Sequence, residues 1–455
     1  MQPEEVRTSA HARAIVEERG LGHVKIGVFD NDGILRGKYI EREKFLAALE
    51  KGLGFCDVVL GWDSSDQLYD NVTFTGWHTA YPDAPVRLLP QTCRALPFEG
   101  NMLLFLGEFA GAAEEVCPRA TLRRVLSRAA AMGYGAAAAA EYEFFVFSET
   151  PASVREKNYR GLTNLTPGYF GYSVLRSSVH AELYQGLLQL ATDMRMPIEG
   201  LHTETGPGVI EAALHYTEAL EAADRAALFK TFVKVLAQRR GLMATFMAKW
   251  SQQLPGQSGH LHVSLSRQDG SAVFYDQAAP HTMSAEMRWF VGGQQALMPE
   301  LLAMVASTVN SYTRLVPGFW APTSATWGVE NRTCALRVIA GGPKSQRVEY
   351  RIAAADINPY LAIAVAIGSG LWGIEHRIEP DEPITGNAYD RMLPARRALP
   401  RTLSEAAERL ARSKAAQELF GAPFVAHFAA SREWEEREFR RAVTDWELAR
   451  YFEII

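Results

Sequence analysis

The segment EYEFFVF, residues 141–147, places two glutamates at the start of an apolar run. Residues 142–147 have the length and composition of a buried strand, on which successive side chains point to opposite faces. Glu141 and Glu143 are two residues apart, so both carboxylates lie on one face. In isolation this pattern is also typical of a solvated strand end. The rest of the chain must therefore decide between a surface feature and a cation site.

Other segments repeat this arrangement. In GHLHVSL, residues 259–265, two histidines share a strand face, and in VEYR, residues 348–351, an acid and a base do so. Alone, each pair is typical of exposed ion pairs or hydrogen bonds. Together the segments offer oxygen-rich ligation, which favours Mg²⁺ or Mn²⁺ over Zn²⁺, and two such ions about 3.5–4 Å apart commonly stabilise phosphoryl transfer. The residues concerned are Glu141, Glu143, Glu204, Glu211 and Glu349, with His260 and His262.

A group of cationic residues follows in the last third of the chain. Arginine presents a planar fork that binds carboxylate and phosphate oxygens in pairs, which lysine does not. A solvated basic face is the alternative explanation. Neither a G-x-x-x-x-G-K-[ST] loop nor a G-x-G-x-x-G loop is present, so neither familiar phosphate loop would hold a nucleotide. The cationic residues are Arg314, Arg332, Arg337, Lys344, Arg347 and Arg351.

Bulk properties restrict the class of protein. A chain of 455 residues exceeds what one core usually supports, so we expect two domains. A formal net charge of -5 disfavours nucleic-acid binding. The polar start MQPEEVRTSA lacks the features of a secretory signal, which indicates a cytoplasmic protein. The apolar stretch 360–374 is too short for a membrane span and is interpreted as a core helix, and the four dispersed cysteines form no CxxC pair.

Local signals outline an α+β organisation. A helix is predicted over residues 9–19, and alternating strands over 24–28 and 34–40 are joined by a tight turn at Asp32-Gly33. Further strands are predicted at 58–62 and 102–109, and a helix at 121–132. We place a domain boundary near residue 115, which gives domains 1–115 and 116–455. Thr402 and Glu405 predict the start of a helix that Gly421 and Pro423 end.

Taken together, the segments resemble the glutamine synthetase family over almost the whole chain. Each motif alone is modest, but their number and order are specific. The resemblance implies a small N-terminal β-grasp domain, beginning with DNDGILRGK at 30–38, and a catalytic domain built as a β-sheet funnel with flanking helices. The segments are EYEFFVF at 141–147, ETGPGVIE at 204–211, SGHLHVSL at 258–265, NSYTRLVPG at 310–318, ENRTCALRV at 330–338 and KSQRVEYRIAAADINPYLA at 344–362.

The resemblance also implies substrates and site residues. ATP would phosphorylate the γ-carboxylate of glutamate, and an amine would displace phosphate to leave an amide. The first Mg²⁺ or Mn²⁺ would be bound by Glu143, Glu204 and Glu211, and the second by Glu141, His260 and Glu349. Glutamate would be held by Gly256, Arg314 and Arg351. Phosphates would be contacted by Arg332, Arg337, Lys344 and Arg347, and the nucleotide by His262 and Ser264.

One segment departs from the family pattern. After NSYTRLVPG, glutamine synthetases have a flap glutamate that helps take a proton from ammonium, whereas this chain has Trp320. General base assistance is typically worth about 10²–10⁴ in rate, so the substitution disfavours ammonia. An indole offers apolar area and a π face to an alkyl or aryl amine. Together with the segments WGVENRTCALRV at 327–338 and TDWELARYFE at 444–453, the substitution resembles the branch of ligases that make γ-glutamyl amides of polyamines or monoamines.

Two acids of the first domain complete the expected catalytic set with Arg332 and Trp320. Asp83 is a candidate contact for the amine, and Asp63 for a role across a subunit interface. The resemblance implies hexameric rings, stacked as a dodecamer, with active sites between subunits. The alternatives are glutamine synthetase itself, a catalytically silent scaffold of the same family, and a guanidino kinase, which shares the catalytic-domain architecture.

Overall fold

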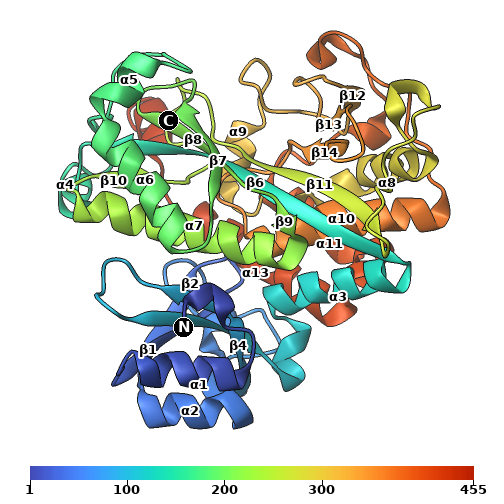
Figure 1. The fold of residues 1–455 in the computed structure, drawn as a ribbon. Coiled ribbons are helices and arrows are strands. Elements are labelled where there is room, and N and C mark those ends of the chain that lie inside the picture. Colours follow the sequence, from blue (N-terminus) through green and yellow to red (C-terminus); the bar gives the residue numbers. More distant parts are fainter.

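The computed structural model describes residues 1–455 and contains two β-sheets, each covered by helices (Figure 1). The first sheet has the strand order β2-β1-β5-β4-β3, with β1 and β5 parallel and the other neighbours antiparallel. Helices α1 (Ser9–Glu18) and α2 (Arg42–Lys51) cover one face of it. The strands are β1 (His23–Phe29), β2 (Leu35–Glu41), β3 (Leu53–Cys56), β4 (Asp83–Ala95) and β5 (Leu103–Phe109).

The predicted hairpin is confirmed, and its turn has a clear physical basis. Gly33 has φ +75°, a left-handed conformation that glycine adopts without a steric cost. The carboxylate of Asp30 accepts hydrogen bonds from the backbone N–H groups of Asp32 and Ile34 at 3.0 and 2.9 Å. The turn therefore satisfies its own backbone donors and fixes the register of β1 with β2.

The predicted strand at 58–62 is wrong. Asp57–Leu60 form a 3-10 helix, in which the N–H of Gly61 donates to the carbonyl of Val58. Val59 and Leu60 are both buried although they are consecutive. A strand would point them to opposite faces, so burying both on one side requires a helical turn.

The second sheet has nine strands and carries the site described below. Its main path is β12-β13-β14-β11-β6-β8-β7, and β9 and β10 also pair with β6. The neighbours are antiparallel except β12 and β13. The long central strand β6 thus joins both halves of the sheet. The strands are β6 (Tyr134–Phe147), β7 (Ile198–Thr203), β8 (Val209–Leu214), β9 (Thr217–Glu218), β10 (Met243–Thr245), β11 (Gly259–Arg267), β12 (Trp327–Val329), β13 (Leu336–Ile339) and β14 (Arg347–Tyr350).

Helices cover the second sheet on the side that faces the first (Figure 1). Helix α10 (Pro359–His376) is buried along almost its whole length, which confirms the core helix predicted at 360–374. Close approach of α8 (Ala285–Leu301) explains its glycines, because a Cβ on Gly293 would lie 2.2 Å from the carbonyl oxygen of Ser369. None of the helices combines the length and the apolar character that crossing a membrane requires.

The remaining helices are α3 (Pro118–Ala131), α4 (Pro151–Glu156), α5 (Val174–Val179), α6 (Ala181–Asp193), α7 (Ala219–Arg239), α9 (Val309–Arg314), α11 (Leu403–Arg412), α12 (Lys414–Phe420), α13 (Ala422–Arg440) and α14 (Asp445–Tyr451). The predicted cap of α11 is confirmed, since Thr402 accepts from the N–H of Glu405. The predicted end at Gly421 is wrong, because α11 stops at Arg412. Ser413 caps a separate helix α12, and Gly421 ends that one, with φ +89°.

A buried ionic network connects the two sheets. The Arg119 guanidinium on α3 donates to Glu108 on β5 at 2.6 Å and to both carboxylate oxygens of Asp224 on α7 at 2.9 and 3.0 Å. The hydroxyl of Tyr360 on α10 also donates to Asp224, at 2.6 Å. Every charge in this network has a partner, so attraction and hydrogen bonding offset the cost of desolvating the charges. All four cysteines are free.

Candidate active site

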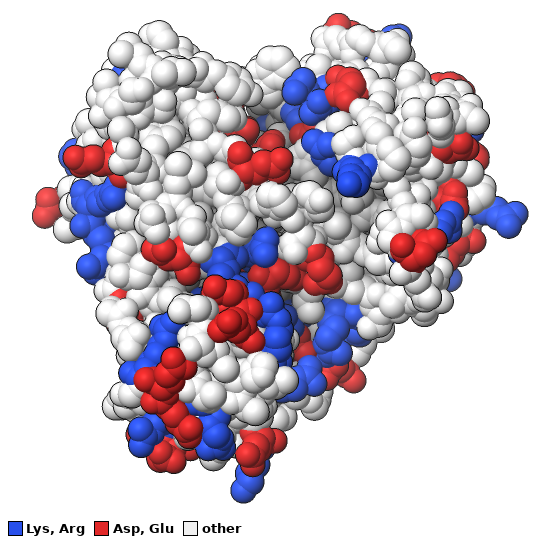
Figure 2. Space-filling model, in the orientation of Figure 1, with Lys and Arg blue, Asp and Glu red and all other residues white.

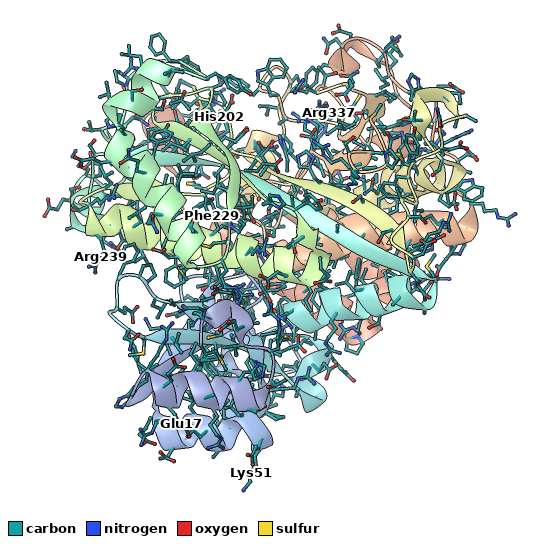
Figure 3. The ribbon with its side chains drawn as sticks, viewed as in Figure 1. Glu17, Lys51, His202, Phe229, Arg239 and Arg337 are labelled. Carbon is teal, nitrogen blue, oxygen red and sulfur yellow. The ribbon has the colours of Figure 1, made fainter.

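The second sheet and its loops enclose a cavity of about 510 Å³. Figure 2 shows acidic and basic side chains along the hollow between the two upper lobes. In Figure 3, His202 and Arg337 lie on opposite sides of it. The predicted residues that line this cavity are Glu141, Glu143, Glu204, Glu211, Gly256, His260, His262, Arg314, Trp320, Arg332, Arg337, Arg347, Glu349 and Arg351.

Strand register places the charged side chains next to one another. On either side of β6, Glu141 pairs with His260 on β11, and Glu143 with Glu211 on β8. Residue 349 on β14 pairs with His262 on one side and with Arg337 on the other. Directly opposed side chains in antiparallel pairs have Cβ atoms about 4.5–5.5 Å apart. The constellation is therefore set by the pairing of five strands.

Glu143, Glu204 and Glu211 form the first acidic cluster. Glu143 accepts a hydrogen bond from the backbone N–H of Ser258 at 2.7 Å. Burial, with the nearby Glu211 carboxylate as a second cause, raises the pKa of Glu143 to about 7. Burial also raises the pKa of Glu211. Carboxylates that are costly to ionise together are suited to sharing a divalent cation.

His202 belongs to this cluster and was not predicted. Its Nε2 lies 3.0 Å from Oε1 of Glu211, and its Nδ1 lies 3.8 Å from Oε2 of Glu204. The Tyr172 ring stacks on it with centroids 4.3 Å apart. Burial lowers the pKa of His202, but the hydrogen bonds to Glu211 and to the Thr203 carbonyl, together with the charges of Glu211 and Glu204, outweigh burial and raise this pKa to about 9. The available signal was its position two residues before Glu204, which directly follows β7.

Glu141, His260 and Glu349 form the second cluster. Nδ1 of His260 lies 3.2 Å from Oε1 of Glu141 and 3.3 Å from Oε1 of Glu349. Burial lowers the pKa of His260 to about 4, with the Arg351 charge adding to it, so the imidazole is neutral at pH 7. Against the effect of burial, the histidines and Arg351 lower the pKa of Glu349 to about 2. His262 also approaches this cluster, with Nε2 3.7 Å from Glu141.

The two clusters suit hard divalent cations. Their donors are mainly carboxylate oxygens, which favour Mg²⁺ or Mn²⁺. Donor atoms of Glu141, His262 and Glu349, and likewise of His202, Glu204 and Glu211, lie within 4.8 Å of one another, and Nδ1 of His260 faces the first of these groups, whereas its buried Nε2 has no partner. Buried polar atoms without partners are uncommon and call for a specific explanation. These residues fit a pair of cations.

The cationic residues form the wall of the cavity that also carries Glu349. Arg314 is 2% exposed, and its guanidinium donates to the backbone carbonyls of Ile352 and Arg351. Arg337 donates to Glu349 at 3.0 Å, and Arg347 donates to Nδ1 of His262 at 3.2 Å. A Cβ at Gly256 would lie 2.6 Å from Cγ of Arg314, which explains the glycine there. The wall thus combines fixed and partly exposed guanidinium groups.

A second cavity of about 420 Å³ adjoins the first. Ser264 and Lys344 line only this second cavity, whereas Glu141, His262 and Arg347 line both. Its other walls include the alanine-rich part of β6 and Tyr216. A polyanionic ligand with an aromatic group could extend across both cavities with its charged end at the carboxylate clusters.

The segment 317–322, here called the flap, forms part of the rim. Trp320 has φ +57° and is 60% exposed, and its side chain lines the first cavity. The flap is held at two points. The Tyr389 hydroxyl donates to the carbonyl of Ala321 at 3.1 Å, and Nζ of Lys249 lies 4.3 Å from the ring centroid of Phe319. This hydrogen bond gives Tyr389 a structural role, because it holds the flap in place.

Asp63 and Asp83 do not line the cavity of their own chain. The Asp63 carboxylate is 7% exposed and accepts hydrogen bonds from Trp434 Nε1 and from the N–H groups of Ser65 and Gln67. Asp83 is exposed at the start of β4. Their expected roles, which involve a neighbouring subunit in the case of Asp63, stay predictions.

Comparison with known proteins fits this geometry. The family model described as glutamine synthetase, catalytic domain, matches residues 115–451. The chain belongs to the glutamine synthetase family. It is therefore an ATP-dependent glutamate ligase that forms C–N bonds, in a family that uses divalent metal ions.

Relatives within the family differ in their acceptors. The chain is 47% identical to "Type-1 glutamine synthetase 2" of Dictyostelium discoideum, over 95% of this chain and 84% of the relative. It is 35% identical to "Glutamate--isopropylamine ligase" of a Pseudomonas species over the full length of both, and 37% identical to "Gamma-glutamylethanolamide synthetase GlnA4" of Streptomyces coelicolor over 97% and 94%. The solved structure "Apo GmaS without ligand" superposes with a TM-score of 0.84 at 26% identity, covering 97% of this chain and 99% of that one.

Proposed function

We propose that this glutamine synthetase family member joins the γ-carboxylate of L-glutamate to a primary amine, either a polyamine or an alkyl or aryl monoamine. The observation that carries the proposal is Trp320 on the cavity rim, at the flap position where glutamine synthetases have a glutamate. The names of the Pseudomonas and Streptomyces relatives, which refer to isopropylamine and ethanolamide, support the same acceptor class.

The proposed reaction has two steps. The γ-carboxylate oxygen of glutamate attacks the γ-phosphorus of ATP, which forms γ-glutamyl phosphate and releases ADP. The amine nitrogen then attacks the acyl carbon, the bond from that carbon to the phosphate oxygen breaks, and the nitrogen loses a proton. Amide and inorganic phosphate are the products. Phosphorylation is needed because a free carboxylate is a poor electrophile.

The charged walls fit the first step. Glutamate and ATP are both anionic, so bringing them together requires fixed positive charge. Guanidinium groups positioned on a transferring phosphoryl group contribute about 10³–10⁵ in rate in related enzymes. Two divalent cations held by the two clusters, Glu143, Glu204 and Glu211, and Glu141, His260 and Glu349, would offset further charge. We assign the phosphates to Arg332, Arg337, Arg347 and Lys344, the nucleotide to His262 and Ser264, and glutamate to Gly256, Arg314 and Arg351.

The rim fits the second step. Trp320, Phe319 and Tyr172 line the same cavity. Aromatic faces attract ammonium groups with about 0.5–2 kcal/mol and also cover alkyl chains. Ammonium itself gains little from apolar area, whereas an organic amine gains from both effects. The rim therefore favours a substituted amine.

The proposed assembly is a dodecamer of two stacked hexameric rings in which Asp63 and Asp83 act near the amine. To act in the cavity of a neighbouring subunit, Asp63 would have to give up the hydrogen bonds that it accepts from Trp434, Ser65 and Gln67. The support within one chain is that neither residue reaches its own cavity. Activity should then depend on assembly, which dilution followed by mass photometry and a rate measurement would test. A fully active monomer would contradict it.

Glutamine synthesis is the second candidate, because the Dictyostelium relative bears that name at 47% identity. Phosphate release with glutamate and ATP should be measured against ammonium, isopropylamine, ethanolamine and putrescine. We expect at least one amine to exceed ammonium in kcat/KM. Equal or better turnover with ammonium would favour the second candidate, and no release with any acceptor would favour a silent scaffold.

A further inference from the structure

A third cavity, of about 590 Å³, lies outside the site described above. Its walls come from the β1–β2 hairpin, α7, β10 and α13, at the junction of the first sheet with the helices of the second. Figure 2 shows acidic and basic side chains intermingled over this junction. No residue of this cavity lines the first cavity, so the proposed reaction does not use it.

Two lysines of α7 form the basic side of this cavity. Lys230 is 8% exposed, and the partner of its ammonium group is the backbone carbonyl of Ile357 at 2.6 Å. Lys234, one helical turn later, makes no hydrogen bond or salt bridge, and its Nζ lies 5.9 Å from the ring centroid of Phe246. Burial and their mutual repulsion lower the pKa of Lys230 to about 7. Neither lysine has a carboxylate counter-ion.

Two acids form the other side. Oδ2 of Asp356 accepts from Thr308 and Ser311 at 2.7 and 2.8 Å, whereas its buried Oδ1 has no partner. Glu435 on α13 makes no salt bridge or hydrogen bond, although Arg432 lies in the same wall. Arg432 is committed to Asp32 at 2.8 Å and to the carbonyl of Ser307 at 2.7 Å. Glu435 therefore has no partner, and Asp356 keeps one carboxylate oxygen free.

A buried charge without full compensation is costly. This applies to Lys230, whose ammonium group has only a backbone carbonyl as partner, and to the unpartnered Oδ1 of Asp356, whereas Lys234 is exposed and Glu435 is half-buried. None of the acids lies within salt-bridge distance of Lys230 or Lys234, although Asp356 and Asp32 are near enough to raise the pKa of Lys230 against the larger effect of burial. A molecule that carries both charges would pair with both sides at once. The remaining wall is apolar and includes Ile34, Phe246 and Met247.

We propose that this cavity binds a small zwitterion, namely an α-amino acid with an apolar side chain. Its carboxylate pairs with Lys230 and Lys234, its ammonium group pairs with Asp356 and Glu435, and its side chain contacts the apolar wall. A cavity of this volume is within the range of small-molecule sites. The site is distinct from the glutamate site and does not depend on which acceptor the enzyme uses.

Residues 246–248, which directly follow β10, connect this cavity to the active site. Phe246 packs against Tyr142, which lies between Glu141 and Glu143 on β6, with ring centroids 5.7 Å apart. The same segment continues to Ala248, whose carbonyl accepts from the N–H of Gln257 in the loop beside Gly256. An occupant of the cavity would contact the residues that support both the acidic clusters and the glutamate loop.

Calorimetric titration of the full-length protein with L-leucine, in saturating L-glutamate to fill the active site, tests the proposal. We expect one leucine per chain, and about tenfold weaker binding for Lys234→Gln and Glu435→Gln. Both side chains lie at the rim, and their variants should unfold at the wild-type temperature. Lys44→Gln and Glu433→Gln, which remove exposed charges elsewhere, should bind leucine like the wild type.

A deaminated probe separates a zwitterion site from a simple anion site. 4-Methylpentanoate, which is leucine without its ammonium group, should bind at least tenfold more weakly than leucine. The proposal is overturned by the absence of saturable leucine binding, by rim variants that bind leucine as the wild type does, or by equal affinity for 4-methylpentanoate.

Discussion

Nε2 of His202 lies 3.0 Å from Oε1 of Glu211, the residue that it faces across the β7–β8 pair. A protonated imidazole in this position repels any cation that the carboxylates bind. Because the pKa of His202 is raised to about 9, its proton must be lost before a metal ion enters without that repulsion.

The affinity of the first cluster for Mn²⁺ should therefore rise between pH 7 and pH 9, by up to about tenfold per pH unit. In His202→Asn the rise between pH 8 and pH 9 should be absent, and only the part caused by the titration of Glu143 near pH 7 should remain. Titration followed by electron paramagnetic resonance would measure it, with the exposed His215→Asn as the matched control. The same pH dependence in His202→Asn would contradict the assignment.

The raised pKa of Glu143 predicts how pH affects the free energy of unfolding of the metal-free protein. Its pKa is raised from 4.5 to about 7, so the folded state binds this proton more tightly than the unfolded state does. The proton on Glu143 adds up to about 3 kcal/mol to the free energy of unfolding. This contribution is fully present below pH 4.5 and is lost as pH rises through 7. Glu143→Gln should lose less stability between pH 5 and pH 8 than the wild type.

Urea unfolding in EDTA at both pH values would measure this difference. Glu182→Gln, an exposed acid on α6, serves as the control and should follow the wild type. Parallel changes in the wild type and Glu143→Gln would show that another group controls the pH dependence.

Trp320 is expected to determine whether the enzyme prefers an organic amine or ammonium as acceptor. Restoring the family's flap acid in Trp320→Glu should move preference toward ammonium, because a carboxylate can accept its proton and the apolar surface is lost. The ratio of kcat/KM for the best amine to that for ammonium should fall by about 10²-fold. Trp320→Phe, which keeps an aromatic face, should retain the wild-type ratio within a few-fold. An unchanged ratio in Trp320→Glu would exclude Trp320 as the determinant.

Asp224 is expected to stabilise the fold, and this effect can be tested without measuring catalysis. Asp224→Ala removes two hydrogen bonds from the Arg119 guanidinium and one from the Tyr360 hydroxyl, all in the interior. Breaking a buried ion pair in this way costs about 3–5 kcal/mol. The urea midpoint should fall accordingly, while Asp193→Ala on the exposed end of α6 should shift it little. A midpoint equal to that of the wild type would mean that water replaces the lost partner.

Sequence reasoning succeeded where the deciding interaction is local. The turn at Asp32-Gly33 and the cap at Thr402 depend on neighbouring residues, and both are present. It failed where burial by distant parts of the chain decides, as at Val59 and Leu60, which are buried together in a helical turn. His202 was missed for a related reason, since its partner Glu211 is on another strand.

The sequence by itself determined which residues could carry charge into a site, because spacing along a strand fixes which side chains share a face. Only the tertiary structure decided that Glu141 faces His260, that residue 349 faces His262, and that Glu143 faces Glu211. Side-chain direction follows from covalent geometry over two residues. Strand register depends on the packing of the whole sheet against its helices, which no single segment encodes.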